Sequence, residues 1–254
     1  MSAMKLRKFN PQWMEDRRLN PSQGPPSIVI IGSKRTGKTT LIQDIMYFFR
    51  HIPAGCIVTG SMSSAEKFGQ FFPPSCIFDK VDDALLQRIE NIVNGQEKLR
   101  KQKVKHDYSC FILFDDCGFD EKFAKKEIMR KLFMNGRHVN VLIIMAIQYC
   151  KSIPPSLRSN IDYVFIMKET FSEQMKKLHQ TVAGMIDDYK EFRELMKKYT
   201  HNFGCLVVDN TSMSTEIVDM LYHYRANFPT RNFKVGSKEL WSCHKKYYIG
   251  DKDP

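Results

Sequence analysis

The sequence lacks the features that mark secreted and membrane proteins. None of its seven cysteines stands at CxxC spacing from another, and their number is odd. The N-terminal stretch MSAMKLRKFNPQW is basic but contains no apolar core of the kind that a signal peptide needs. The longest strongly apolar stretch, 139–147, is too short to span a bilayer. The sequence therefore predicts a soluble intracellular protein in a reducing compartment, without disulfides, a zinc site or a membrane span.

Acidic residues are also in short supply. The chain has 28 Asp and Glu against 39 Lys and Arg, which gives a formal net charge of +11. A domain this basic often binds a polyanion such as nucleic acid or an anionic membrane, although solubility alone would also account for the charge. The 254 residues are 43% hydrophobic, enough for a substantial core, and contain no internal repeat or low-complexity block. These features favour one large globular domain with appendages.

Short apolar runs alternate with amphipathic segments over most of the chain. The strand candidates are 27–32, 55–60, 73–79, 109–116, 139–147, 162–167 and 203–208, the last of them being the final core strand. The helix candidates are 38–50, 81–103, 122–134, a segment opening with capping-box spacing between Thr170 and Glu173, and 187–199. Strands that alternate with helices predict an α/β fold with a mostly parallel central sheet flanked by helices.

Composition divides the chain into three parts. Residues 1–26 are polar, basic and punctuated by proline, which predicts an N-terminal arm. Residues 27–226 hold the alternating strands and helices and form the predicted catalytic domain. Residues 227–254 are basic and aromatic, and we expect them to form a C-terminal tail.

One glycine-rich turn fits a phosphate-binding pattern. Residues 32–39 read GSKRTGKT, which matches GxxxxGK[ST], the P-loop, with a strand before it and a helix after it. The glycines let backbone N–H groups face the phosphates, and the helix presents its positive end. Lys38 would reach the terminal phosphates, and the Thr39 hydroxyl would ligate Mg²⁺. The predicted site for ATP and Mg²⁺ comprises Gly32, Ser33, Lys34, Arg35, Thr36, Gly37, Lys38, Thr39 and Thr40.

Two further strand ends carry polar groups. The apolar run FILFDD, at 111–116, has the pattern of a Walker B strand. Asp115 is the predicted magnesium residue beside Thr39, and Asp116 is the candidate catalytic base, although Glu is commoner at that position. Gln148 ends the next buried strand and would hydrogen-bond the γ-phosphate or the attacking water if that strand lies beside the P-loop strand. The alternatives are a solvated acidic turn and a solvent-facing strand end.

Three arginines stand near these motifs in the sequence. Arg35 lies inside the P-loop turn, Arg137 follows the helix after the Walker B strand, and Arg158 lies in the segment IPPSLRSN. An arginine from a neighbouring subunit can neutralise the charge that develops at the γ-phosphate. A surface position or a salt bridge is an equal alternative for each of them.

The order of several motifs resembles a known family. GSKRTGKTT, FILFDD, FMNGRHVN, MAIQY, IPPSLRSNIDYVFI, GCLVVDNTS and the later YHYRA are similar to segments of the DNA-packaging ATPases of nucleocytoplasmic large DNA viruses. This is the poxvirus-like group of the FtsK–HerA superfamily of P-loop ATPases. The similarity covers roughly residues 25–230. It implies an ASCE/RecA-like P-loop fold and a homo-oligomeric ring of five or six subunits. The ring pumps double-stranded DNA into a preformed capsid.

The resemblance also implies roles for individual residues. Lys38, Thr39 and Asp115 would bind nucleotide and magnesium. Asp116 stands at the family's catalytic acid position, and Gln148 stands at its sensor position. The implied partners are DNA of any sequence and a capsid or portal vertex protein. The implied locations are the viral factory in the host cytoplasm and the virion.

The trans-acting arginine and the DNA contacts are less defined. Arg137 is the first candidate for a finger that acts on a neighbouring subunit, and Arg158 is the second. DNA-contacting residues do not carry over by motif, so charge alone nominates Lys98–Lys105, Lys122–Lys131 and the two terminal segments. Such charges would grip phosphates without reading the base sequence.

Two other function classes compete with a translocase. A small-molecule P-loop kinase would transfer a phosphoryl group to a metabolite, and a nucleotide-dependent switch would bind without a DNA track. The second acid and the polar strand end fit water activation better than transfer, and there is no arginine-rich lid. The guanine-reading NKxD pattern and the transporter signature LSGGQ are both missing. The favoured prediction is ATP hydrolysis coupled to DNA translocation.

Overall fold

The computed structural model describes residues 4–116, 126–150 and 153–248. Its strands are β1 Arg7–Lys8, β2 Ser27–Ile31, β3 Ala54–Thr59, β4 Ile77–Phe78, β5 Cys110–Asp115, β6 Val141–Ile147, β7 Tyr163–Ile166, β8 Gly204–Asp209 and β9 Leu221–Arg225. Its helices are α1 Gln12–Leu19, α2 Lys38–Phe48, α3 Met62–Gly69, α4 Asp83–Lys101, α6 Glu127–Asn135, α7 Pro155–Arg158, α8 Ser172–Val182, α9 Tyr189–Tyr199, α10 Ile217–Met220 and α11 Lys238–Tyr247, with 3₁₀ turns η1 Pro74–Cys76 and η2 Gly136–Val139.

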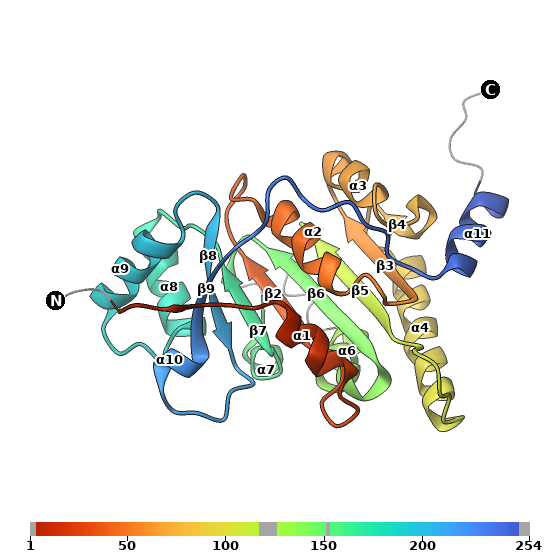
Figure 1. The fold of residues 1–254 in the computed structure, drawn as a ribbon, viewed down its shortest axis with the longest axis horizontal. Coiled ribbons are helices and arrows are strands. Elements are labelled where there is room, and N and C mark those ends of the chain that lie inside the picture. Colours follow the sequence, from red (N-terminus) through yellow and green to blue (C-terminus); the bar gives the residue numbers. More distant parts are fainter. Residues whose placement is uncertain (1–3, 117–125, 151–152, 249–254) are drawn as a thin grey trace.

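The described strands form one nine-stranded sheet with helices on both faces (Figure 1). Their order is β1-β9-β8-β7-β2-β6-β5-β3-β4. The β7–β8 and β8–β9 pairs are antiparallel, and the other pairs are parallel. The predicted α/β class with a mostly parallel sheet is confirmed.

The central strands are apolar on both sides, as a parallel sheet between two helical layers requires. Along β2, Ile28 and Ile30 pack into a cluster with α1, α2 and α3. Val29 and Ile31, which point the other way, pack into a second cluster with α4, α6, α8 and α9. The resulting three layers hold the central strand ends in fixed positions.

The strand order brings the sequence motifs to one edge of the sheet. β6 lies between β2 and β5, with Ile31 paired with Ile147 and Asp115 paired with Ala146. The P-loop follows β2, Asp116 follows β5, and Gln148 follows β6. We call this side the carboxyl edge, at the top of Figure 1, and the opposite side the amino edge. The condition set for Gln148, a strand beside the P-loop strand, is met.

Several predicted elements differ in the structure. Segment 73–79 forms mainly the η1 turn and a two-residue strand, and a short helix that was not among the helix candidates, α7, forms at Pro155–Arg158. The predicted Thr170–Glu173 capping box is wrong, because Phe171 occupies the N-cap position of α8. The Glu169 carboxylate instead accepts hydrogen bonds from the N–H groups of Thr170 and Phe171. Of the predicted helix 122–134, residues 122–125 lie outside the described ranges.

The strand at 203–208 is not the last one in the sheet. β9 follows it and pairs with it along its length. From Tyr222 onward its sequence YHYR alternates aromatic and basic residues, with Tyr222 and Tyr224 buried and Arg225 exposed. This period-two pattern is typical of a strand, but its polar residues hide it in a basic region.

The N-terminal segment packs against the sheet instead of extending from it. Phe9 is only 1% exposed, and its ring lies edge-on or tilted against five others, those of Trp13, Tyr163, Phe165, Tyr222 and Tyr224. β1 pairs with β9 at the sheet edge. The predicted boundary at residue 26 therefore does not separate two hydrophobic cores.

The C-terminal segment also packs on the body of the protein. Phe233 and Val235 are buried, and the N–H of Val235 donates to the carbonyl oxygen of Phe71 at 2.8 Å. As in the N-terminal segment, the predicted boundary at residue 226 falls within a packed structure.

We expect Phe9→Ala to lower the free energy of unfolding by about 3 kcal/mol or more, because truncating a buried Phe leaves a cavity and removes apolar contacts. Urea unfolding followed by circular dichroism measures the change. Trp13→Ala is the matched control, since Trp13 touches the same ring but is 41% exposed. A Phe9 effect as small as the Trp13 effect would show that the segment is a detachable arm.

The structure shows no disulfide and no membrane-spanning helix within the described residues. Each cysteine in the described ranges carries a free thiol, and burial raises the pKa of Cys56 to about 12. Cys117 lies outside those ranges. Within them, no helix combines the length and the apolar composition that crossing a bilayer requires.

Candidate active site

The P-loop joins β2 to α2 and needs glycine at both of its glycine positions. Gly37, at the N-cap of α2, has φ 96°, in the left-handed region that residues with a Cβ rarely adopt. Gly32 has no room for a side chain, because an added Cβ would lie 2.6 Å from the Cβ of Met167. Gly37 is therefore required by backbone conformation and Gly32 by space.

Lys38 is held inside the loop. Its side chain is 8% exposed, and Nζ donates to the carbonyl oxygens of Gly32 at 2.7 Å and Ser33 at 3.1 Å. Burial lowers the pKa of Lys38, while the nearby carboxylates of Asp116 and Asp115 act to raise it. An ammonium group desolvated in this way is poised to pair with a phosphate.

Asp115 ends β5 and is 2% exposed. The Thr59 hydroxyl lies 3.5 Å from it, and the Ser64 hydroxyl also bonds to it. Burial raises the pKa of Asp115, opposed by the Ser64 hydrogen bond and the charge of Lys38. Ser64 Oγ lies 3.4 Å from Thr39 Oγ1, so hydroxyls of α2 and α3 meet the carboxylate of β5. Hydroxyl and carboxylate oxygen donors of this kind suit Mg²⁺.

Asp116 and Gln148 meet across the adjacent ends of β5 and β6. Gln148 Nε2 donates to Asp116 Oδ1 at 2.6 Å. Asp116 has φ 48°, a left-handed conformation that Asp tolerates better than most residues. The two side chains predicted separately from the sequence therefore form one hydrogen-bonded pair.

Most of these groups line one cleft at the carboxyl edge, which has a volume of about 250 Å³. Thr59 and Gln148 contact its two carboxylates but do not line it. Its lining residues are Lys34, Arg35, Gly37, Lys38, Thr39, Thr40, Ser61, Ser64, Lys67, Asp115, Asp116 and Phe203. Three members of the predicted nucleotide set lie behind it. Gly32 packs on Met167, Ser33 Oγ donates to Glu169 Oε2 at 3.3 Å, and Thr36 Oγ1 donates to the carbonyl oxygen of Ser33 at 2.8 Å.

The sequence analysis missed several residues of the cleft. Thr59 does not line the cleft but contacts Asp115 there; it ends a buried strand at the same edge, so the reasoning used for Gln148 would have found it. Ser61 caps α3 by accepting from the N–H of Ser64, a pattern visible in the sequence SMSS. Phe203 carries no local signal, because only the assembled sheet places it beside the P-loop.

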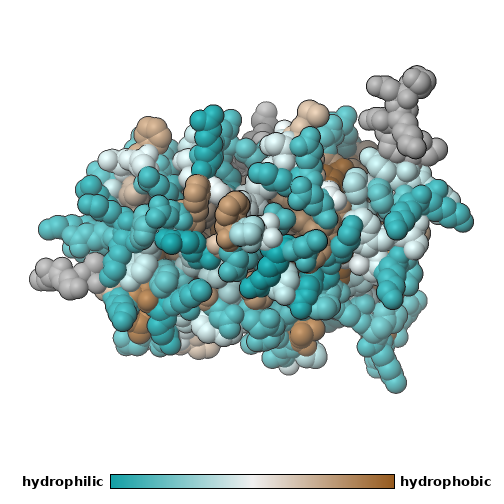
Figure 2. Space-filling view, turned by 45° about the horizontal axis from the view of Figure 1, so that its top comes forward, coloured by the Kyte–Doolittle hydropathy of each residue, from teal (hydrophilic) through white to brown (hydrophobic). Residues whose placement is uncertain are grey.

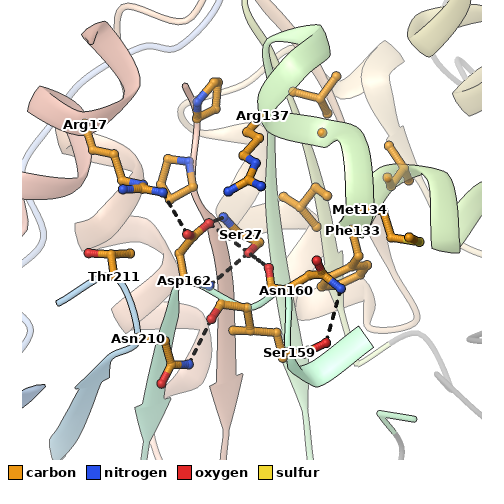
Figure 3. Close-up of a pocket in the computed structure, with 17 residues that line it drawn as sticks. Arg17, Ser27, Phe133, Met134, Arg137, Ser159, Asn160, Asp162, Asn210 and Thr211 are labelled. Carbon is orange, nitrogen blue, oxygen red and sulfur yellow. Dashed lines mark hydrogen bonds and ion pairs between the residues drawn. The ribbon is translucent and has the colours of Figure 1, made fainter. Parts of the chain in front are cut away.

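Arg137 and Arg158 lie at the other edge. Arg137 is in η2, before β6, and Arg158 ends α7, before β7. Figure 3 shows Arg137 aimed into a pocket of about 300 Å³ that it shares with Arg17, Ser27 and Asp162. Arg17 pairs with Asp162 at 2.9 Å, whereas the Arg137 guanidinium makes no hydrogen bond or ion pair with the residues that the structure describes.

The length of β2 separates this pocket from the cleft. Ser27 begins β2 and lines the pocket, while the P-loop follows its other end. A five-residue strand spans about 15 Å at about 3.3 Å per residue. Neither arginine therefore belongs to the cleft of its own chain.

The two predicted basic clusters differ in whether their described side chains form ion pairs within the protein. Lys98, Arg100, Lys101, Lys103 and Lys105 are exposed around the end of α4 that projects at the amino edge (Figure 1). In the second cluster, Lys126 lies 3.7 Å from Asp83 and Lys131 lies 3.1 Å from Glu127, in ion pairs. Residues 122–125 of the second cluster lie outside the described ranges; among the described residues, the charges of the first cluster are the more available to a polyanion.

The chain has relatives in several large DNA viruses. It is 33% identical over 237 residues to the uncharacterized protein L437 of Acanthamoeba polyphaga mimivirus, covering 91% of this chain and 82% of that protein. It is 31% identical over 228 residues to the uncharacterized protein 075L of Invertebrate iridescent virus 6, covering 89% of this chain and 87% of that protein.

Solved structures share the fold at low sequence identity. The genome packaging NTPase B204 from Sulfolobus turreted icosahedral virus 2, in complex with AMPPCP, aligns with a TM-score of 0.57 at 14% identity, covering 82% of this chain and all of that one. The conjugation coupling protein TcpA of pCW3, with ATPγS, has a TM-score of 0.57 at 13% identity, covering 80% of this chain and 60% of that one. These likenesses confirm the P-loop ATPase fold.

The family resemblance found in the sequence is confirmed as well. The sequence model of the family described as Poxvirus A32 protein matches residues 17–221, which include the P-loop, the Asp115–Asp116 pair, Gln148 and both candidate arginines. The match covers most of the chain and all of the strands from β2 to β8. The chain belongs to the Poxvirus A32 protein family.

Proposed function

We propose that this protein is an ATP-hydrolysing translocase that packages double-stranded viral DNA into a preformed capsid. The observation that carries the proposal is the cleft that Lys38, Thr39, Asp115 and Asp116 line together, with Gln148 hydrogen-bonded to Asp116. A carboxylate and an amide beside the phosphate site suit the orientation and deprotonation of a water molecule. Membership of the A32 family, with the fold of a genome packaging NTPase, supports DNA as the substrate that is moved.

The proposal assigns a role to each side chain predicted to act on the nucleotide, the metal or the water. Lys38 binds the terminal phosphates of ATP, and Thr39 and Asp115, supported by Ser64, hold Mg²⁺. Bound Mg²⁺ supplies positive charge to the phosphates. Asp116 accepts a proton from the attacking water. Gln148 holds Asp116 in place and exchanges this hydrogen bond for one to the γ-phosphate, so its position reports which nucleotide is bound.

The site is completed by a neighbouring subunit in a ring of five or six. Arg137 lies at the amino edge without an ion-pair partner among the described residues, so it is available to an adjacent chain. A head-to-tail ring that sets the amino edge of one subunit against the carboxyl edge of the next would bring it to the γ-phosphate. Arg158, at the same edge, is the second candidate.

The protein would move along the phosphate backbone of double-stranded DNA. Exposed lysines and arginines would contact the phosphates without reading the base sequence. The exposed charges at the end of α4 are the first candidates among the described residues. The ring would dock on a capsid or portal vertex protein, in the viral factory of the host cytoplasm and in the virion.

DNA-stimulated hydrolysis tests this function. We expect random-sequence double-stranded DNA to raise the steady-state rate of ATP hydrolysis by the purified protein. The DNA concentration that gives half of the stimulation should rise at least about tenfold between about 50 and about 200 mM salt, because counterions compete for the phosphates. Lys101→Ala combined with Lys103→Ala should flatten this salt dependence. A rate of ATP hydrolysis that DNA does not change at either salt concentration would contradict the translocase and favour a kinase or a switch.

A further inference from the structure

Phe203 is an exposed aromatic side chain at the candidate nucleotide cleft. It lies between α9 and β8, at the carboxyl edge, and is 66% exposed. Its ring packs on the P-loop, since a Cβ added to Gly37 would lie 3.1 Å from Phe203 Cδ1. It lines the same cleft as Lys38, Thr39 and Thr40. Its ring therefore contributes to the wall of the cleft and little to the core.

The backbone around Phe203 is held in an unusual conformation. Asn202 has φ 48° and Phe203 has φ 61°, two consecutive residues in the left-handed region. Asn tolerates this region, whereas a bulky residue there is an outlier. Strain of this kind gathers at ligand-binding sites, where the surrounding structure maintains it.

Contacts on both sides fix this turn. The N–H of Gly204 donates to the carbonyl oxygen of His201 at 3.0 Å, and Arg225 of the neighbouring β9 donates to the same oxygen at 3.2 Å. Gly204 has no room for a side chain, because an added Cβ would lie 2.2 Å from the carbonyl oxygen of Tyr199. The ring is thus presented on a rigid support.

The strand order shows which part of a nucleotide would meet this ring. The Asp116–Gln148 pair lies on the β6 and β5 side of the P-loop strand β2, so the γ-phosphate must point to that side. Phe203 precedes β8, which lies on the other side of β2, beyond β7. The nucleoside end of the ligand, opposite to the γ-phosphate, would extend toward Phe203.

We propose that Phe203 is the platform on which the base of the bound nucleotide stacks. The proposal rests on the proposed function, since it takes the P-loop as the phosphate site. The Phe side chain has a π-face but no hydrogen-bonding group, so it can stack on a base but makes no hydrogen bond that would distinguish one base from another. The ligand class is a purine nucleoside triphosphate, whose two fused rings give the larger stacking surface.

A protein-docking role fits the surface less well. Figure 2 turns the carboxyl edge toward the viewer and shows hydrophobic residues singly or in small groups within a mainly hydrophilic surface. A docking site for a protein partner would present a broader apolar patch. A single ring beside a phosphate loop matches a small planar ligand.

Calorimetric titration with two probes, MgATP and magnesium tripolyphosphate, tests the platform. We expect Phe203→Ala to weaken ATP binding about tenfold, in the range found for base–aromatic stacking, and to leave tripolyphosphate binding unchanged. Phe203→Trp should keep ATP affinity. Its fluorescence should be quenched by ATP but not by tripolyphosphate, after subtraction of the wild-type response. Phe171→Ala is the matched control, since Phe171 is 70% exposed at the same edge but does not line the cleft.

Two results would overturn the platform while leaving the P-loop assignment intact. One is unchanged ATP affinity in Phe203→Ala. The other is an equal loss for both probes, which would indicate a structural effect on the loop. Failure of the proposed function has a different signature: the wild-type protein binds neither probe, or Lys38→Ala binds both as well as wild type does. That signature would remove both proposals.

Discussion

Lys38→Ala should reduce the rate of ATP hydrolysis by about 10³-fold, because it removes the cation that the loop presents to the terminal phosphates. The chain should stay folded. Among the described residues, Nζ donates only to carbonyl oxygens of the P-loop, those of Gly32 and Ser33. Burial lowers the pKa of Lys38, so the substitution removes a desolvated charge. Steady-state hydrolysis and thermal unfolding by circular dichroism measure the two effects.

Lys34→Ala is the matched control for this substitution. Lys34 carries the same charge in the same loop and lines the same cleft, but its side chain is exposed. We expect it to retain most of the activity, since an exposed charge interacts weakly through water. Normal turnover in Lys38→Ala would remove the P-loop assignment. Equal losses in both variants would mean that net charge at the loop, and not a specific phosphate contact, is what matters.

The parts of the site that the sequence predicted are those that local pattern encodes. A glycine turn between a strand and a helix, and acids at the end of an apolar strand, occupy a few consecutive residues each. The placement of Gln148 was predicted only conditionally, because adjacency of β6 and β2 depends on how the whole sheet assembles. The observed Asp116–Gln148 hydrogen bond follows from that assembly and from no local feature.

The parts that could not be predicted depend on contacts between distant segments. β1 has two residues and becomes a strand only by pairing with β9, near the other end of the chain. In the sequence Phe9 is one apolar residue in a basic segment, whereas in the fold five aromatic rings from other elements surround it. Phe203 reaches the P-loop because β8 runs antiparallel to β7, which turns its first residue toward the carboxyl edge. Periodicity reports burial, but it does not report which strands become neighbours.

Arg137→Ala should leave ATP affinity unchanged and lower turnover by about 10³-fold, the smaller end of the range for an arginine finger. The arginine lies at the amino edge and does not line the cleft of its own chain, so ATP binding there does not depend on it. Loss of Arg137 would lower only the rate of hydrolysis in the neighbouring subunit, where its charge would stabilise the transition state. Titration with an ATP analogue and steady-state kinetics, both on the assembled ring, separate the two quantities.

Mixing of two inactive variants decides whether Arg137 acts in trans. Arg137→Ala subunits keep Asp116, and Asp116→Ala subunits keep Arg137. In a ring with one type of head-to-tail interface, an equal random mixture places a complete pair at about one quarter of the interfaces. We therefore expect activity to return to about that fraction of the wild-type rate if the interfaces act independently. The same mixture made with Arg158→Ala is the control, and recovery only there would assign the finger to Arg158. If neither mixture recovers activity although mixed rings form, the charge at the γ-phosphate has another source, and the amino edge is not the face that completes the neighbouring cleft.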